Sequence, residues 1–179
     1  NYDFSLQSPS FLHIFGTDKL GRDVFSRILC GAKTSFGLTF LMLFLIVFIG
    51  MIVGLIAGLS NDKVESFFNN IINGLLAFPD TIFAIAIVGI VGGGLFNTVF
   101  ALALIWWTKY ARLTLALVKQ EKKKNYLVMA KMSGVPTLQR IIRYLLPNIL
   151  SQILVTAFLD IGNMMISLAG LSFLGLASQ

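Results

Sequence analysis

The stretch from Thr34 to Asn61 contains no charged side chain. Within it, Phe36–Leu59 is long enough to cross a bilayer as a helix, because a span needs about 20 predominantly apolar residues. Charged residues make up only 12% of the 179-residue chain, about half of the fraction that is usual in a soluble domain. This feature therefore predicts a helical membrane protein.

Three further apolar runs predict three more spans, over Phe67–Val91, Leu95–Val118 and Ile149–Leu171. Pro79 interrupts the first of these runs and predicts a kink, because proline cannot complete the hydrogen bonding of a helix. Gly92–Gly94 predicts a tight turn between the first run and the next. The fold class predicted from these features is an all-α, polytopic transmembrane helical bundle.

Three glycines in the first span, Gly50, Gly54 and Gly58, recur every four residues. Small residues at this spacing share one helix face and predict close packing against a second helix. The alternative is the ordinary enrichment of glycine in membrane helices.

The distribution of charge predicts how the chain is oriented. Lys109–Pro147 contains nine Lys and Arg residues against a single acid, Glu121. The positive-inside rule then predicts a cytoplasmic position for Lys119–Pro147. Four alternating spans predict that residues 1–33 lie outside, and that the polar loop Ser60–Ser66 lies inside.

Polar residues within the predicted spans are candidate functional residues. Asp160 in mid-span is costly in lipid, so it is expected to face a cavity or a partner group. Asn163 and Met164 follow it, and the methionine is interpreted mainly as packing. Asp160 itself fits a transport-pathway role and a structural role equally well. Lys109 and Arg112, beside two tryptophans, predict an anchor at the membrane interface.

A short basic segment separates the last two spans. Tyr126–Ser133 predicts a short helix, and Gly134 predicts its end because glycine readily adopts the left-handed conformation there. Pro136 fits the first turn of a second helix. This second helix has one apolar face, formed by Leu138, Ile141, Ile142, Leu145 and Leu146. The shape suits docking into a groove of another protein, or resting on anionic lipid.

The basic segment resembles the EAA loop of the permease subunits of binding-protein-dependent ABC importers. Ala130, Gly134 and a Leu-Pro pair at residues 146–147 stand in the register of that motif, whereas Val128 and Met129 occupy its Glu-Ala positions. Three other stretches, "FGTDKLGRDVFSRILCGAKTS", "LAFPDTI" and "AGLSFLGLA", resemble the peptide/nickel subfamily. "LDIGNMM", "VGIVGGGLFN" and "KYARLTLALV" are similar to the nickel-transport permease of the second, C-type subunit class.

The resemblance implies a type I ABC importer permease fold, with four of the usual six spans covered by this chain. It implies an extracytoplasmic segment over residues 1–35 and a transmembrane domain over residues 36–179, with an EAA-like coupling segment over residues 119–147. Asp18, Arg22 and Asp23 match a family segment outside the first span, where a salt-bridged structural turn is expected.

The implied site residues are of two kinds. Contact with an ATPase is expected from Tyr126, Ala130, Lys131, Gly134, Val135 and Pro136. A transport-pathway role is the weaker expectation for Asp160, Asn163 and Met164. No self-sufficient metal site is expected, because His13 is the only histidine and Cys30 the only cysteine.

The function expected from the resemblance is that of a non-enzymatic subunit of an ATP-driven importer in the bacterial cytoplasmic membrane. The sequence has no G-x-x-x-x-G-K-[ST] phosphate loop, so ATP and Mg²⁺ are expected on a partner chain. The partners implied are a second permease chain, two ATPase subunits, an extracytoplasmic binding protein and membrane lipid, with no nucleic acid. The expected substrate is nickel or a nickel chelate, and the alternative is a di- or oligopeptide. Two other classes of protein are disfavoured. A membrane-embedded enzyme would need a Ser-His or Cys-His pair in the spans, and an ion channel would need a filter motif, and this sequence shows neither.

Overall fold

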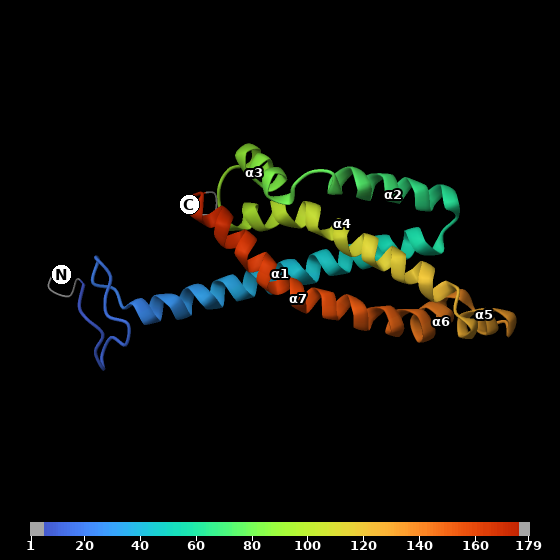
Figure 1. The fold of residues 1–179 in the computed structure, drawn as a ribbon, viewed down its shortest axis with the longest axis horizontal. Coiled ribbons are helices and arrows are strands. Elements are labelled where there is room, and N and C mark those ends of the chain that lie inside the picture. Colours follow the sequence, from blue (N-terminus) through green and yellow to red (C-terminus); the bar gives the residue numbers. More distant parts are fainter. Residues whose placement is uncertain (1–5, 176–179) are drawn as a thin grey trace. The chain divides into compact units, whose positions relative to one another are not determined.

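The computed structural model describes residues 6–175, and apart from an isolated bridge between Thr17 and Asp23 all regular structure in them is helical. This confirms the all-α class. The chain divides into two units, Asn1–Phe40 and Leu41–Gln179, each treated separately. The helices, shown in Figure 1, are α1 (Val24–Leu59), α2 (Asp62–Leu76), α3 (Asp80–Val91), α4 (Leu95–Lys122), α5 (Asn125–Met132), α6 (Thr137–Arg140), the π-helical segment η2 (Ile141–Leu145) and α7 (Leu146–Phe173).

Three helical stretches among the described residues are long and apolar enough to cross a membrane: Val24–Leu59, Leu95–Lys122 and Thr137–Phe173. The α2–α3 pair forms a fourth if the two helices together count as one broken span. The first helix begins at Val24, well before the predicted start of the span at Phe36. At about 1.5 Å per residue, its 36 residues exceed the ~30 Å thickness of the hydrocarbon core.

The turn before α1 is held by two aspartates. Asp18 accepts hydrogen bonds from the backbone N–H groups of Leu20 and Arg22, at 2.8 and 3.0 Å, and forms ion pairs with Arg22 at 3.0 Å and Arg27 at 2.5 Å. Asp23 caps α1 by accepting the Ser26 N–H at 2.8 Å. The prediction of a salt-bridged turn is therefore confirmed.

We expect this turn to persist in acid. The backbone N–H of Arg22, with that of Leu20 and the side chains of Arg22 and Arg27, holds the pKa of Asp18 well below its usual value of 3.8. A lowered folded-state pKa gives stabilisation that is complete above the usual value and is lost as the pH falls through the folded value. The amide chemical shifts of Leu20 and Arg22, followed by NMR through the usual aspartate range, should stay unchanged. A titration centred near pH 3.8 would contradict the assignment, and Asp18→Asn serves as the non-titrating control.

The three glycines of α1 pack directly against α4. A Cβ atom added at Gly50 would lie 2.6 Å from Tyr110 Cβ, and one at Gly54 would lie 2.5 Å from Thr114 Cβ. At Gly58 the distance to Val118 Cγ1 would be 2.7 Å. No larger residue fits these gaps, so the predicted close packing is confirmed.

The second predicted span is broken instead of kinked. Helix α2 ends at Leu76, α3 begins at Asp80, and the two helices differ in direction by 83°. Pro79 is extended, with φ −60° and ψ 126°, which excludes a continuous helix through this point. The loop before α2 is shorter than the predicted Ser60–Ser66. Helix α2 already begins at Asp62, because Asn61 caps it by accepting the Val64 N–H at 3.1 Å.

Helix α4 is the centre of the second unit and packs against α2, α3 and α7 (Figure 1). Lys119 Nζ lies 2.7 Å from Glu65 Oε1 of α2, and Arg112 donates to the Asn73 side chain. Lys122 donates to the Gly58 carbonyl at 2.9 Å. The first two bonds join α4 to α2, and the third joins the end of α4 to the end of α1.

The last span follows a π-helical turn. Pro147 has no N–H and its ring clashes with the carbonyl four residues earlier, so a regular α-helix cannot pass through it. Segment η2 accommodates the proline by a wider turn, in which Leu146 N–H donates to the Ile141 carbonyl. The side-chain amide of Asn148 donates a hydrogen bond to the Tyr144 carbonyl at 2.6 Å. Helical structure therefore runs without a gap from Thr137 to Phe173.

Candidate functional site

An ion pair joins the two longest helices of the second unit at their midpoints. Asp160 lies midway along α7 and is buried, and Lys109 lies midway along α4. Lys109 Nζ is 2.8 and 2.7 Å from the two Asp160 carboxylate oxygens. The Tyr110 hydroxyl donates to the same carboxylate at 2.9 Å. The cost of an acid in mid-span is thus offset by a counter-charge and a hydrogen bond within the chain.

This arrangement gives Lys109 and Arg112 partners that the sequence did not predict. Both are expected from the sequence to anchor the chain at the membrane interface, which stays a prediction. In the structure, Lys109 bonds to Asp160 of α7 and Arg112 bonds to Asn73 of α2. A mid-helix cation in lipid is favourable only when it finds such a partner, and the helix packing supplies one to each.

The ion pair borders a cavity of 460 Å³. Its polar wall is formed by Asp80, Trp106, Lys109, Asp160, Asn163 and Ser167. The indole N–H of Trp106 is buried and has no hydrogen-bond partner in the described part of the chain. Leu76 and Phe78, beside the break between α2 and α3, contribute apolar surface. A volume of this size, with a few convergent polar groups on an apolar wall, suits a small molecule.

The three predicted pathway residues do not all line the cavity. Asp160 and Asn163 both line the cavity. Met164 is fully buried in the α7 packing and is not part of the cavity wall, which favours packing as its role. Among residues 6–175, no group of three or more His, Cys, Asp or Glu side chains is placed to hold a metal ion. A pathway role for Asp160 and Asn163 stays a prediction.

The coupling segment has the helix–turn–helix shape that the sequence predicts. Helix α5 ends in a Schellman motif, in which Val135 N–H donates to the Ala130 carbonyl at 3.1 Å and Gly134 N–H to the Lys131 carbonyl at 3.2 Å. Gly134 has φ +77°, as the motif requires. Pro136 then precedes the first residue of α6. The segment is thus a short helix that reverses sharply, with Lys131 exposed and Ala130 buried.

A buried carboxylate ties this segment to the membrane helices. Glu121, at the end of α4, is 3% exposed and forms an ion pair with Lys124 at 2.6 Å. It also accepts a hydrogen bond from the Tyr126 hydroxyl. Asn148 of α7 donates to that hydroxyl at 3.2 Å. Partial burial of Tyr126 and its bond to the carboxylate raise the pKa of this tyrosine to about 12, so the hydroxyl remains a donor at physiological pH.

Sequence reasoning missed three residues of these networks: Tyr110, Glu121 and Asn148. Glu121 is the one acid within the basic stretch of residues 109–147, and that isolation was the available signal. The partner of Asp160 was also detectable in principle, because an acid and a lysine at the centres of two spans are each too costly to remain unpaired.

Comparison with known proteins identifies the family. Residues 50–179 match the model of the binding-protein-dependent transport system inner membrane component. The chain belongs to this family. The match covers α2 to α7 and therefore includes both the cavity and the coupling segment.

Individual relatives are similar over nearly the whole chain. The nickel transport system permease protein NikC of Escherichia coli K12 is 36% identical over 171 residues, covering 96% of this chain and 62% of the relative. The di/tripeptide transport system permease protein DppC of Pseudomonas aeruginosa is 37% identical over 183 residues, covering 99% and 60%. The dipeptide transport system permease protein DppC of Alkalihalophilus pseudofirmus is 37% identical over 174 residues, covering 97% of this chain and 57% of the relative. The chain thus spans about 60% of the length of these relatives.

Proposed function

We propose that the chain is part of a permease subunit of an ATP-driven importer in the bacterial cytoplasmic membrane. The observation that carries the proposal is the coupling segment. It lies between the last residue of α4 and the first residue of α7, and it is bonded to both helices through Glu121, Tyr126 and Asn148. A rigid helix–turn–helix of this kind can transmit the movement of a docked protein to the membrane helices. The family match over residues 50–179 supports the same function.

Energy for transport is proposed to come from partner chains. ATP and Mg²⁺ would bind to two ATPase subunits, which contact Tyr126, Ala130, Lys131, Gly134, Val135 and Pro136. A second permease chain would complete the pathway, and an extracytoplasmic binding protein would deliver the substrate. The chain itself takes no part in catalysis, in keeping with a family of transport components.

Nickel, free or as a chelate, is the proposed substrate, supported by the likeness to the E. coli nickel permease. A di- or oligopeptide is the second candidate, supported by relatives of equal similarity. The cavity chemistry bears on this choice. Lys109, the Trp106 N–H and Asn163 suit the oxygen atoms of an organic molecule, and Asp80 suits a cation. These groups favour a chelate or a peptide over a bare metal ion.

Uptake measurements test the proposal. Cells with the complete operon, with and without the gene for this subunit, would be supplied with ⁶³Ni²⁺ or a labelled dipeptide. Loss of nickel uptake alone supports the metal assignment, and loss of dipeptide uptake alone supports the peptide alternative. Unchanged uptake of both would refute the proposed substrates, and failure of the ATPase to co-purify with the subunit would refute the importer function itself.

Changing Gly134 is expected to uncouple transport from ATP hydrolysis. Gly134→Val places a β-branched residue at φ +77°, which costs about 1–2 kcal/mol and favours a different end to α5. A Cβ atom there meets nothing within 4 Å, so the rest of the chain should fold normally. We expect an assembled complex with several-fold lower uptake per ATP hydrolysed, measured in proteoliposomes.

Gly162→Ala is the matched control for this experiment. Gly162 lies in α7, where a Cβ atom also meets nothing within 4 Å, and its φ is not positive. It should leave the ratio of uptake to hydrolysis unchanged. Normal coupling in Gly134→Val would show that the shape of the turn does not matter for transmission.

A further inference from the structure

A second cavity, of 520 Å³, lies where α1 and α4 end and α5 and α6 begin. Three cationic residues line it, Lys122, Lys131 and Arg140. No acid is present among the described residues of its wall. The cavity therefore attracts an anion, and the proposed ATPase contact, which includes Lys131, does not account for Lys122 and Arg140.

The cations retain hydrogen-bonding capacity towards the cavity. Lys122 donates to the Gly58 carbonyl at 2.9 Å, and one terminal nitrogen of Arg140 donates to Thr137 Oγ1 at 2.9 Å. Arg140 Nε, however, is buried and has no hydrogen-bond partner among residues 6–175. The Lys131 side chain forms no hydrogen bond or ion pair with any described residue. A buried guanidinium N–H is normally satisfied, so an acceptor from outside the chain is expected at this point.

The position of the cavity and its remaining wall indicate which anion it accepts. Leu59 and Lys122 are the last residues of α1 and α4, two helices long and apolar enough to cross a membrane. The cavity therefore lies at the shared end of two candidate spans, where lipid headgroups of the side predicted to be cytoplasmic are expected. The rest of the wall is largely apolar: Leu59, Leu127, Val128, Ile141 and Leu145.

We propose that this cavity binds the headgroup phosphate of an anionic phospholipid. Arg140 and Lys131 are its hydrogen-bond donors, and Lys122 adds positive charge. Inorganic phosphate could use the same donors, but it leaves the apolar wall exposed to water, whereas the first carbons of an acyl chain cover it. The bound lipid would brace α5 and α6 against the ends of α1 and α4.

Lipid retention by the complete importer tests the proposal. The complex with full-length subunits would be purified from nanodiscs that contain phosphatidylglycerol or only phosphatidylcholine, and bound lipid would be counted by native mass spectrometry. We expect retained phosphatidylglycerol in the wild type and about a hundredfold weaker retention in Lys131→Gln/Arg140→Gln, because two charge-assisted hydrogen bonds are lost.

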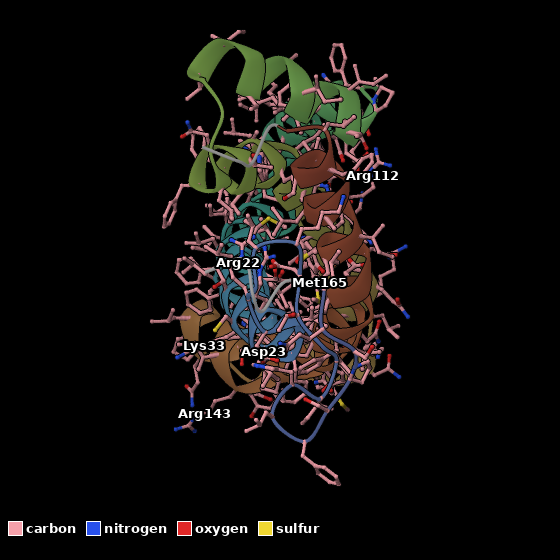
Figure 2. The ribbon with its side chains drawn as sticks, turned by 90° about the vertical axis from the view of Figure 1, so that its left-hand side faces the viewer. Arg22, Asp23, Lys33, Arg112, Arg143 and Met165 are labelled. Atoms are coloured by element: carbon pink, nitrogen blue, oxygen red, sulfur yellow. The ribbon has the colours of Figure 1, made fainter. Side chains whose placement is uncertain are left out.

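Arg143→Gln is the matched control, because it removes one nearby positive charge outside this cavity. Arg143 is exposed, and its side chain extends away from the ribbon (Figure 2). This variant should retain lipid like the wild type, and an equal loss in it would indicate general attraction to the membrane surface instead of a site.

Three further results would overturn the proposal. The first is full retention of phosphatidylglycerol by the double variant. The second is equal retention of phosphatidylcholine together with displacement by inorganic phosphate, which would identify a free-anion site. The third is cross-linking of an acidic ATPase side chain to position 140, which lies outside the proposed ATPase contact, because such a cross-link in the resting complex would assign the cavity to the partner protein.

Discussion

Lys109→Met is expected to prevent the subunit from accumulating in a folded form. The change removes the counter-charge of Asp160, whose side chain is only 6% exposed. Loss of one partner from a fully buried ion pair costs about 3–5 kcal/mol, and the 48% exposure of the Lys109 side chain places the cost here towards the lower end of that range. This is a large part of the roughly 5–15 kcal/mol that stabilises a typical domain. The measurement is the amount of full-length subunit that remains monodisperse and assembled after detergent extraction.

A double variant then separates a structural role of Asp160 from a transport role. Lys109→Met/Asp160→Asn removes both charges and leaves a side-chain carbonyl that can accept the Tyr110 hydroxyl bond. We expect the amount of folded subunit to recover. Recovered folding with normal uptake would assign the pair to structure alone, whereas recovered folding without uptake would assign it to the pathway.

The control for both variants is Lys63→Met, which removes an exposed lysine from the first turn of α2. It should leave folding and uptake unchanged. Wild-type amounts of the Lys109→Met single variant would contradict the importance of the ion pair.

Gly54→Leu is expected to force α1 and α4 apart. A Cβ atom at this position would lie 2.6 Å from the Ala111 carbonyl oxygen and 2.5 Å from Thr114 Cβ. A backbone oxygen cannot move aside unless the whole helix moves. Overpacking of this kind typically costs about 1–3 kcal/mol. Each kcal/mol lowers the melting temperature of a chain of this size by about 2–4 °C, so thermal unfolding of the purified subunit should occur several degrees lower.

Gly74→Leu supplies the comparison for Gly54. A Cβ atom at Gly74 in α2 has nothing within 4 Å, so the same enlargement should have little effect on thermal unfolding. Equal destabilisation by both changes would show that the α1–α4 approach is looser than the structure indicates.

Features that depend on neighbours in the chain were predictable from sequence. The charge-free stretch predicted a span, and the four-residue spacing of Gly50, Gly54 and Gly58 predicted the face on which α1 packs. Gly134 predicted the end of α5, because a left-handed residue followed by Pro136 determines the backbone locally. The family resemblance rested on such short stretches, and the match over residues 50–179 bears it out.

Some local signals were too weak to give the right extent of a helix. The helix α1 begins at Val24 because Asp23 caps it, although the apolar pattern starts only at Phe36. At Pro79 a kink was predicted where the structure has an 83° break. Proline shows that a regular helix is interrupted, but the direction of the next helix depends on what it packs against, here α4.

The sequence by itself determined that this chain is a helical membrane protein, which helix face carries small residues, and where its coupling segment turns. Only the tertiary structure decided that Lys109 meets Asp160 and that Asn148 of α7 bonds to Tyr126. The physical reason is that an isolated charge in a span only requires a partner, and the choice of partner depends on how each helix is rotated about its axis. That rotation is set by the packing of all the helices together, which no single stretch of sequence contains.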